Sequence, residues 1–598
     1  MAKELPARSE VDEEHKWNLE DIYQDDNKWN KDFDKVKNMI KKLDEYKGNL
    51  VSDSKRLYQG LELIMEIEEI VSRLYAYAHM RQDENTANQI YQGLYNRAQS
   101  LNNEVNSATS FMVPEIITLS QEEVENFLEK DNNLKLYRQL LENIMRKKEH
   151  YLSTEAEKLL AMAGDVTQGP NNIFGMLNNA DLTFPTIKNE EGEEVRVTHG
   201  RYIDFMQSGE RSVRKDAFMS LYSKYDEFIN TFASTLNTSV KSHIFYAKAR
   251  KYDSALEAAL DNDNVSVDVY DNLISTVKEN IDGMYKYVSI RKELLGLDEL
   301  HMYDVYVPLV KELDIKIPYN EAVETICKGV NPLGEEYGNI LKEGFNSGWI
   351  DIYENKGKRS GAYSSGCYGV HPYVLMNYTD SLENMFTLAH EMGHALHTYY
   401  SNETQPFVYA NYKIFVAEVA STLNEILLLH YLLENTDDDT KKRYLINHYL
   451  EQFRGTVFRQ TMFAEFEKII HKAAEVGTPL TPQFLKETYR KLNREYFGPN
   501  IVIDQQIDLE WARIPHFYYN FYVYKYATGF SAATALANKI LSEGEPAVEK
   551  YINFLKSGDS DYPLNVLKEA GVDMSSSTPI KSAIDTFKEF LNEFEKLI

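Results

Sequence analysis

The sequence contains little cysteine, proline or glycine for its length. Its 598 residues include two cysteines, Cys327 and Cys367. So few thiols exclude a secreted scaffold built on disulfides, and we expect both to be free in a reducing compartment. Proline occurs 16 times and glycine 28 times. Because these residues interrupt regular structure, their scarcity predicts long, uninterrupted helices.

Long apolar runs and an excess of positive charge are also absent. No stretch approaches 18 consecutive apolar residues, and the first residues lack the apolar core of a signal peptide. The 65 basic and 93 acidic residues give a net charge of −28, so we expect neither nucleic acid nor a membrane as a partner. Hydrophobic residues at 43% and charged residues at 26% are ordinary for a soluble globular protein, and a cytoplasmic location is predicted.

Helical periodicity runs over most of the sequence. Apolar positions three and four apart recur within residues 27–165 and 210–260, and again from residue 381 almost to the end. Two shorter segments break this pattern. Residues 182–199 predict a β-hairpin with a glycine turn, and the glycine-rich residues 347–378 predict a second β region. The expected fold class is therefore mainly α, with small β elements.

The most informative motif is H-E-x-x-H, formed by His390, Glu391 and His394 within NYTDSLENMFTLAHEMGHALHTYYS. Asp380 and Glu383 fit a capping box, which predicts that a helix begins just before the motif. Four helical steps bring His394 to within about 40° of His390, so that both imidazoles can bind a single tetrahedral zinc ion. Glu391 lies one step further round, where it would not bind the metal but could take a proton from the zinc-bound water.

A catalytic zinc ion takes a third protein ligand and keeps one position open. The spacing that places a third histidine six residues after His394 finds Tyr400 here, so a carboxylate from a later helix is expected. The candidate is Glu418, which has apolar neighbours on both sides in FVAEVASTLNE and therefore needs a partner. A salt-bridged glutamate is the alternative. Glu425 lies seven residues on, on the same helical face, and could orient a ligand histidine. His397 is interpreted as a packing residue or a neighbour of the ligands.

A tyrosine-rich segment, ARIPHFYYNFYVYKYATGFSAA, occurs later in the chain. It contains His516, Tyr519, Tyr522 and Tyr526, and if helical it would place Tyr522 and Tyr526 four residues apart on one face. For most of its tyrosines a core aromatic stripe is the simplest interpretation. Peptide hydrolysis, however, develops negative charge on an oxygen atom, and phenol or imidazole donors stabilise such charge. We expect at least one of these four residues to do so.

The glycine-rich segment KRSGAYSSGCYGVHPYVLMNY directly precedes the helix of the motif. Gly361, Gly366 and Gly369 would permit close approach of another backbone, and an extended edge here could pair with a peptide substrate. An ordinary hairpin that covers the core is the alternative.

These motifs together resemble the thimet and oligoendopeptidase family of zinc oligopeptidases. HEMGHALH, FVAEVASTLNE and HFYYNFYVYKYATG follow one another in the chain, while GAYSSGCYGVHPYVLMNY and the opening WNLEDIY are similar to the oligoendopeptidase F branch. The resemblance implies that His390, His394 and Glu418 bind one zinc ion per chain and that Glu391 is the catalytic base.

The same resemblance implies roles for the downstream histidine and tyrosines. His516, Tyr522 and Tyr526 are similar to the family residues that contact the substrate and the developing oxyanion. One departure concerns FYYNFY, which stands where thimet-type relatives have a glycine-rich segment. Tyr519 is therefore the alternative to Tyr522.

The resemblance further implies a mostly helical ellipsoid of two lobes with a deep central channel, zinc on the channel floor and small β elements near the zinc site. On this basis we divide the chain into an N-terminal helical domain, residues 1–200, which ends in the β-hairpin, and a catalytic domain, residues 201–598. Such a channel admits short unstructured oligopeptides and excludes folded proteins. The expected function is hydrolysis of internal peptide bonds. The alternatives are an exopeptidase on the same zinc scaffold and a non-catalytic helical binding protein with an inert motif.

Overall fold

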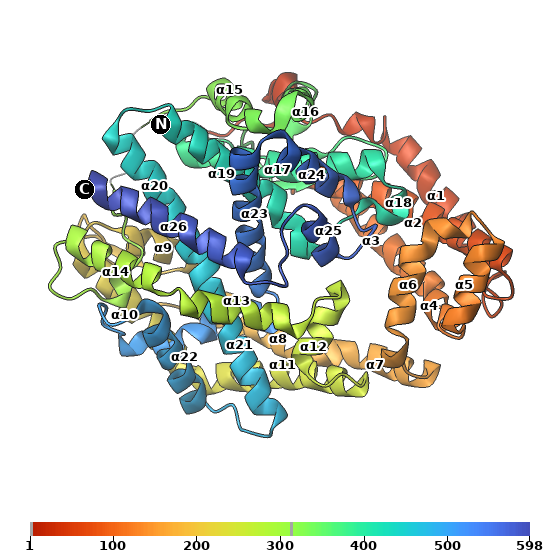
Figure 1. Ribbon diagram of the computed structural model, residues 1–598, viewed down its shortest axis with the longest axis horizontal. Coiled ribbons are helices and arrows are strands. Elements are labelled where there is room, and N and C mark those ends of the chain that lie inside the picture. Colours follow the sequence, from red (N-terminus) through yellow and green to blue (C-terminus); the bar gives the residue numbers. More distant parts are fainter. Residues whose placement is uncertain (1–3, 311–314) are drawn as a thin grey trace. The chain divides into compact units, whose positions relative to one another are not determined.

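The computed structural model describes residues 4–310 and 315–598 (Figure 1). Helices account for 72% of the residues and strands for 3%, so the mainly α fold class with small β elements is confirmed. The chain forms two compact units, and each draws on three separate stretches of sequence. The domain boundary that we predicted at residue 200 divides the chain by position in the sequence, whereas the two units are defined by contacts in space. The predicted boundary stays a prediction. The two lobes and their channel stay a prediction as well.

Unit 1 comprises Met1–Tyr151, Ile315–Glu434 and Leu536–Val572. Its helices are α1 (Asp26–Leu43), α2 (Ser54–Glu84), α3 (Gln89–Thr109), α4 (Met112–Ile116), α5 (Gln121–Lys130), α6 (Arg138–Arg146), α15 (Tyr319–Gly329), α16 (Gly334–Asn346), α17 (Leu382–Thr404), α18 (Phe407–Ala410), α19 (Ile414–Glu434), α24 (Glu545–Ser557) and α25 (Pro563–Glu569). The short helix η4 (Leu134–Tyr137) precedes α6.

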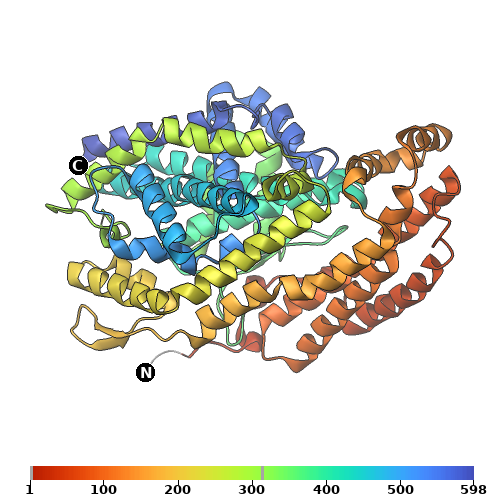
Figure 2. The same cartoon turned by 90° about the horizontal axis from the view of Figure 1, so that it is seen from below.

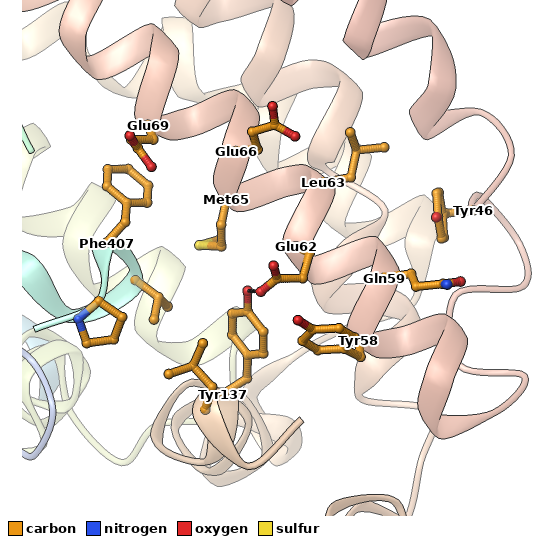
Figure 3. A pocket seen from close by; sticks show the side chains of 13 residues that line it. Tyr46, Tyr58, Gln59, Glu62, Leu63, Met65, Glu66, Glu69, Tyr137 and Phe407 are labelled. Carbon is orange, nitrogen blue, oxygen red and sulfur yellow. Dashed lines mark hydrogen bonds between the residues drawn. The ribbon is translucent and has the colours of Figure 1, made fainter. Parts of the chain in front are cut away.

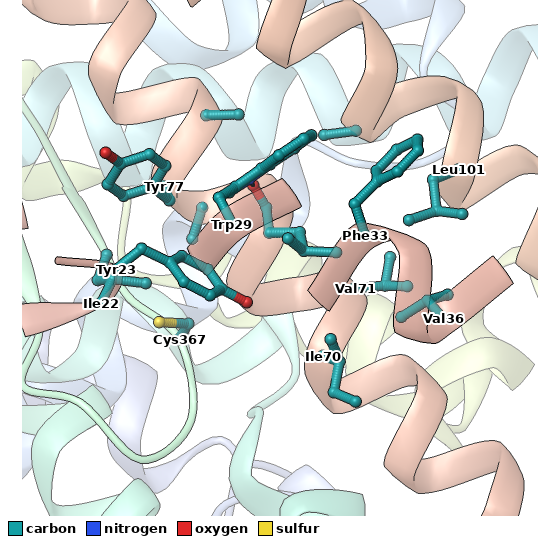
Figure 4. Packing of buried hydrophobic residues seen from close by; sticks show 14 of the residues in the cluster. Ile22, Tyr23, Trp29, Phe33, Val36, Ile70, Val71, Tyr77, Leu101 and Cys367 are labelled. Atoms are coloured by element: carbon teal, nitrogen blue, oxygen red, sulfur yellow. Dashed lines mark hydrogen bonds between the residues drawn. The ribbon is translucent and has the colours of Figure 1, made fainter. Parts of the chain in front are cut away.

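The first three helices of unit 1 pack around one hydrophobic core (Figure 4). Trp29, Phe33 and Val36 recur at helical spacing on α1, and all three are buried. Asp25 begins this helix, because its carboxylate accepts backbone N–H groups of the first turn. The indole N–H of Trp29 donates to the carbonyl oxygen of Leu74 on α2 at 2.9 Å, which joins the two helices inside the core.

Both β regions predicted from the sequence are present. In unit 1, β5 (Tyr373–Leu375) lies between β3 (Ile350–Asp351), which is parallel to it, and β4 (Tyr363–Ser365), which is antiparallel. This sheet packs against α17 through β4 and β5. In unit 2, β1 (Thr186–Lys188) and β2 (Glu194–Arg196) form the predicted antiparallel hairpin. Its turn contains Gly192 at a φ of 80°, a conformation that glycine adopts without strain.

Unit 2 comprises Leu152–Asp314, Asn435–Ala535 and Asp573–Ile598. Its helices are α7 (Thr154–Thr167), α8 (Gly169–Met176), α9 (His199–Gln207), α10 (Arg211–Glu227), α11 (Ile229–Ala249), α12 (Ala255–Leu260), α13 (Val267–Glu279), α14 (Asp282–Leu294), α20 (Asp439–Phe453), α21 (Arg459–Glu475), α22 (Pro482–Phe497) and α26 (Thr578–Leu597). Helix α23 (Tyr524–Glu543) begins in this unit. Helix α21 is central, since α11, α13 and α22 all pack against it (Figures 1 and 2).

Helix α19 is the most apolar long helix among the described residues. By length and composition it passes a test for membrane-spanning helices, yet 72% of its most apolar window is buried inside the structure. Such burial is typical of a core helix. The two cysteines, Cys327 and Cys367, form no disulfide, as expected.

Candidate metal centre

Helix α17 carries both histidines of the motif. It begins at Leu382, and Ser381 is its cap, because the Ser381 hydroxyl accepts the N–H of Asn384 at 3.1 Å. The predicted capping box of Asp380 and Glu383 is therefore wrong by one position. The extended backbone at Ser381 aims its short hydroxyl at the third residue of the helix, which satisfies the free N–H without help from a glutamate.

The close approach of α19 to α17 depends on Gly393, inside the motif. A Cβ atom at Gly393 would lie 2.6 Å from the Cα of Ser421 and 2.7 Å from the carbonyl oxygen of Ala420. Real Cβ atoms do not come so close to a backbone, so only glycine fits here without a shift of α19. The sequence shows this glycine but gives no sign that the second helix rests on it.

Asn424 is a second residue that joins these helices. It is fully buried on the apolar helix α19, and its amide donates to the carbonyl oxygen of Ala389 on α17 at 3.2 Å. The hydroxyl of Tyr337 on α16 donates to the Asn424 side-chain oxygen at 2.9 Å. Asn424 was not among the residues predicted from the sequence, although a lone amide within a run of apolar residues is a usable signal that a buried hydrogen-bond partner exists.

His390, His394 and Glu418 come together between α17 and α19. One ligand atom from each lies within 4.8 Å of the other two. The Oε2 atom of Glu418 is 3.4 Å from Nε2 of His390 and 3.5 Å from Nε2 of His394. Ligand atoms about 2.0–2.1 Å from a tetrahedral zinc ion are separated by about 3.3–3.4 Å. Both distances from Glu418 therefore fit a tetrahedral zinc ion.

Glu425 decides which nitrogen of His390 faces the cluster. Its Oε1 atom lies 2.6 Å from Nδ1 of His390. An ionised carboxylate only accepts hydrogen bonds, so Nδ1 donates and the lone pair of a neutral ring is on Nε2, toward Glu418. Burial by itself would lower the pKa of His390, but its hydrogen bonds to Glu418 and Glu425 outweigh burial and raise that pKa. A bound cation would take the place of the proton on Nε2 and leave a neutral ring whose lone pair faces the metal. The contact expected between Glu425 and a histidine of the motif is thus present.

The surroundings of Glu418 differ from the expectation of an enclosed glutamate. The side chain is 38% exposed, against 27% for His390 and 17% for His394. Val416, Val419 and Ala420 on α19 are buried, while the Glu418 side chain faces the two histidines of α17. Burial by itself would raise the pKa of Glu418, but hydrogen bonding and the charges of the two histidines outweigh it and lower that pKa. The group is therefore an ionised carboxylate with open space beside it.

Glu391 and His397 occupy different environments on α17. Glu391 is 8% exposed, and its burial raises the pKa of the carboxyl group toward the range of a general base at neutral pH. His397 stacks on Tyr412 with ring centroids 3.7 Å apart. Burial lowers the pKa of His397 to about 3, so the ring is neutral. The interpretation of His397 as a packing residue is confirmed.

The tyrosine-rich segment lies in unit 2 and brings three of its predicted residues together. The Tyr526 hydroxyl is 3.5 Å from Nε2 of His516, and the Tyr522 ring lies 6.2 Å from His516 and 5.4 Å from Tyr526. Tyr519 is 49% exposed, with its ring 5.5 Å from His516. The metal-ligand candidates are in unit 1, so the part of these residues in a reaction stays a prediction.

The expected helical spacing of Tyr522 and Tyr526 is wrong. Helix α23 begins only at Tyr524, and His516 belongs to a separate short helix, η12 (Pro515–Tyr518). Asn520, between them, has a φ of 49°, which ends helical geometry. Tyr522 lies just after this turn and just before α23, whereas Tyr526 lies in the first turn of α23, so the two residues do not share one helix face.

Strand β4 precedes the metal helix and lies against it. It pairs with β5 along one edge, and no described strand pairs with its other edge. Close packing is visible at Gly366, where a Cβ atom would lie 3.2 Å from the Thr398 side chain on α17. Pairing of the free edge with a peptide stays a prediction.

A cavity of about 730 Å³ also lies in unit 1, on the exposed face of α2 (Figure 3). Glu62 faces it and accepts a hydrogen bond from the Tyr137 hydroxyl. Phe407, just beyond the end of α17, forms part of the opposite wall. None of the residues that line this cavity belongs to the cluster of His390, His394 and Glu418. The candidate metal chemistry is therefore separate from it.

Comparisons with known proteins agree on one family. Residues 205–586 match the model of peptidase family M3, and residues 115–184 match the model named oligopeptidase F. The chain is 52% identical to oligopeptidase PepF of Bacillus subtilis, over all of this chain and 89% of that protein. It is 41% identical to group B oligopeptidase PepB of Streptococcus agalactiae, over 99% of this chain and 98% of that one.

A solved structure gives the same result. The crystal structure of oligoendopeptidase-F from Enterococcus faecium has a TM-score of 0.76 and 40% sequence identity, and the match covers 96% of this chain and 99% of that chain.

Proposed function

Because the chain belongs to peptidase family M3, whose members are metallopeptidases, we propose that it is a zinc endopeptidase that hydrolyses internal bonds of short unstructured peptides. Peptide hydrolysis follows from the family and from relatives named as oligopeptidases. The metal, the residue roles and the substrate class are our proposal. The observation that carries it is the convergence of one ligand atom each from His390, His394 and Glu418, all within 4.8 Å of one another, beside the buried Glu391.

We assign one zinc ion per chain to His390, His394 and Glu418. Zinc, when bound, lowers the pKa of a water molecule and polarises the scissile carbonyl. Glu425 holds the ring of His390 in the orientation that presents Nε2 to the metal, through the 2.6 Å contact at Nδ1. Gly393 keeps α19 close enough to α17 for Glu418 to reach the two histidines.

Glu391 is the proposed general base. It accepts the proton that the attacking water loses as the water oxygen bonds to the carbonyl carbon. It then delivers a proton to the leaving nitrogen as the carbon–nitrogen bond breaks, so that the products are a carboxylate and an amine. Its burial supports this role, since a raised pKa makes the carboxylate a stronger base toward the proton of the water.

His516, Tyr522 and Tyr526 are proposed as donors to the charge that develops on the substrate oxygen. Burial, followed by the charge of Arg459, lowers the pKa of His516, so its imidazole is neutral at pH 7 and carries one N–H donor. Tyr519 remains the alternative to Tyr522.

Backbone pairing along the free edge of β4 is the proposed way in which a substrate is held. Such pairing needs an extended chain, so a folded protein is a poor substrate and a short flexible peptide is a good one. It uses backbone groups rather than a chain terminus, which favours internal cleavage. An exopeptidase would need a group that captures a free terminus.

The test uses peptides of about 5–20 residues with free ends and the same peptides acetylated and amidated, with products identified by mass spectrometry. We expect internal cleavage of both forms at rates within a few-fold, loss of activity with a chelator and recovery with Zn²⁺. The Glu391→Gln variant is the matched control, because it keeps the metal ligands. Trimming of free peptides while blocked ones survive would identify an exopeptidase, and absence of bound metal with no turnover would identify a binding protein.

A further inference from the structure

The chain makes an unusual turn between His516 and α23. Asn520 and Phe521 both have left-handed backbone conformations, with φ values of 49° and 60°. Asparagine tolerates this region, but a bulky residue such as phenylalanine rarely adopts it. A strained turn of this kind persists only where surrounding groups hold it in place.

A buried carboxyl group on another helix holds the turn. The backbone N–H of Phe521 donates to Oε1 of Glu467 on α21 at 3.1 Å. Glu467 is completely buried, and Phe521 is 2% exposed. The ring of Phe521 lies 4.3 Å from that of His471, on the same helix as Glu467, and 5.8 Å from that of Tyr270 on α13. The turn is thus fixed by one hydrogen bond and one aromatic anchor.

The groups around Glu467 are neutral. Burial raises the pKa of Glu467 to about 8, so the carboxyl group is protonated at neutral pH. Burial lowers the pKa of His243 on α11 to about 4 and that of His471 to about 3. Nδ1 of His471 donates to the Glu467 carbonyl oxygen at 2.8 Å, so its Nε2 accepts from Nδ1 of His243 at 3.1 Å. Burial keeps Tyr270 protonated by raising its pKa. Hydrogen bonds rather than ion pairs therefore define this site.

The Asn520–Phe521 turn determines the positions of Tyr522 and Tyr526. It reverses the chain after η12 and places the Tyr522 ring 6.2 Å from His516 and 5.4 Å from Tyr526. We propose that Glu467 is a positioning residue, which holds the Asn520–Phe521 turn and thereby sets the geometry of Tyr522 against His516. This inference rests on the proposed function, in which those side chains stabilise the developing oxyanion.

Two substitutions separate a positioning role from a general contribution to folding. Glu467→Gln keeps an oxygen that accepts the Phe521 N–H and matches the neutral acid in shape. Glu467→Met fills the same space without an acceptor. We expect kcat of the Gln variant within about threefold of the parent, and kcat of the Met variant at least tenfold lower with little change in KM and in zinc content, because displacement of a catalytic group by about 1 Å can cost 10²-fold.

Hydrogen exchange gives a readout that does not depend on activity. With mass spectrometry of fragments that cover residues 516–524, we expect at least tenfold faster exchange in Glu467→Met and parent-like exchange in Glu467→Gln. Glu465→Met is the matched control on the same helix, since Glu465 bonds to Lys278 and Tyr496 and not to the turn. It should leave both exchange of this segment and kcat within about threefold of the parent.

Each result bears on one of the two proposals. Unchanged exchange in Glu467→Met, or a loosened segment with parental kcat, overturns the positioning role. A well-folded Glu467→Gln that loses kcat at least tenfold also overturns it, and this arm remains informative if Glu467→Met does not fold. A parent enzyme that cleaves no peptide overturns the proposed function instead, while the exchange data still report whether Glu467 holds the turn.

Discussion

Glu425 holds His390 by a 2.6 Å contact between its Oε1 atom and the ring Nδ1. The two residues are on different helices, α19 and α17, and the contact fixes the ring so that Nε2 faces Glu418. Glu418 comes from the same helix as Glu425, two turns earlier. One helix therefore supplies both a candidate ligand and the group that orients another ligand.

Removal of the orienting carboxylate should weaken the metal site without destroying it. We expect Glu425→Leu to lower zinc affinity about 10–100-fold, because the ring of His390 loses the acceptor that fixes its tautomer and orientation. Competition with a chromophoric chelator measures the affinity. Glu425→Gln, which keeps an acceptor oxygen, should lie between the parent and the Leu variant. Equal zinc affinity in all three proteins would show that Glu425 does not orient the ligand.

Loss of either histidine should remove metal and activity together. We expect His390→Ala and His394→Ala to contain less than a tenth of the parent's zinc by elemental analysis, since two ligands hold the ion far more weakly than three. His397→Phe is the control, because the phenyl ring can still stack on Tyr412 and no proposed ligand is lost. Full activity in the presence of chelator would exclude the metal from the reaction.

Glu391→Gln should separate metal binding from catalysis. The amide has the same shape but cannot accept the proton of the attacking water, so we expect kcat to fall at least about 10²–10⁴-fold. Zinc content should match that of the parent, because Glu391 is not part of the three-residue cluster. Turnover within a few-fold of the parent would refute its assignment as the base.

Tyr522→Phe should lower kcat about 10²–10³-fold with little change in KM, the loss typical of one donor to an oxyanion. The change removes one oxygen and keeps the ring, so a residue that only packs would show nearly normal kinetics. Tyr519→Phe and Tyr526→Phe, assayed beside it, identify the donor among the three. If all three variants keep parental kcat and His516→Ala carries the whole loss, the imidazole is the donor.

Glu467 should make stability depend on pH in a defined direction. Its pKa is about 8 in the folded protein, above the ordinary value of 4.5, so between these pH values the folded state binds more protons than the unfolded state. Stability therefore falls as pH rises through this window. The nearby His243 and His471 are neutral in the folded protein but bind protons in the unfolded chain around the ordinary pKa of 6.5, so they add a slope of opposite sign that fades by about pH 7.5.

Glu467→Gln should remove this dependence. We expect the free energy of unfolding of the parent to fall between pH 6.5 and 8 more steeply than that of the variant, by up to about 1.4 kcal/mol per pH unit. Urea denaturation at several pH values in this range measures both slopes. Parallel slopes would mean that the carboxyl group titrates at its ordinary pKa.

Sequence patterns located residues along a helix better than contacts between helices. The spacing of His390 and His394 put both on one face, and an acid flanked by apolar residues pointed to Glu418. Neither pattern indicates the distance between α17 and α19. That distance depends on Gly393 and on backbone atoms near Ser421. The degree of exposure of Glu418 depends on that packing too, so an apolar sequence context did not mean an enclosed side chain.

Local backbone geometry was the second feature that the sequence patterns did not predict. The left-handed turn at Asn520 and Phe521 contains no glycine, the residue that marks such turns, so the segment resembled a continuous helix. The acceptor of the hydrogen bond that holds the turn is Glu467, more than fifty residues earlier in the sequence. At the start of α17, Asp380 and Ser381 are both good caps, and the backbone rather than the sequence selected the serine.

Each unit is built from three separate stretches of sequence, and this determines when it can form during synthesis of the chain. The proposed metal-binding helices emerge from the ribosome well before α24, which packs against α17 and places Phe554 5.2 Å from His397. Unit 1 gains its last stretch, Leu536–Val572, only shortly before unit 2 gains Asp573–Ile598. Unit 1 therefore lacks α24 while the whole stretch Asn435–Ala535 of unit 2 is made, so the side of α17 that α24 covers stays exposed in the nascent chain over that interval.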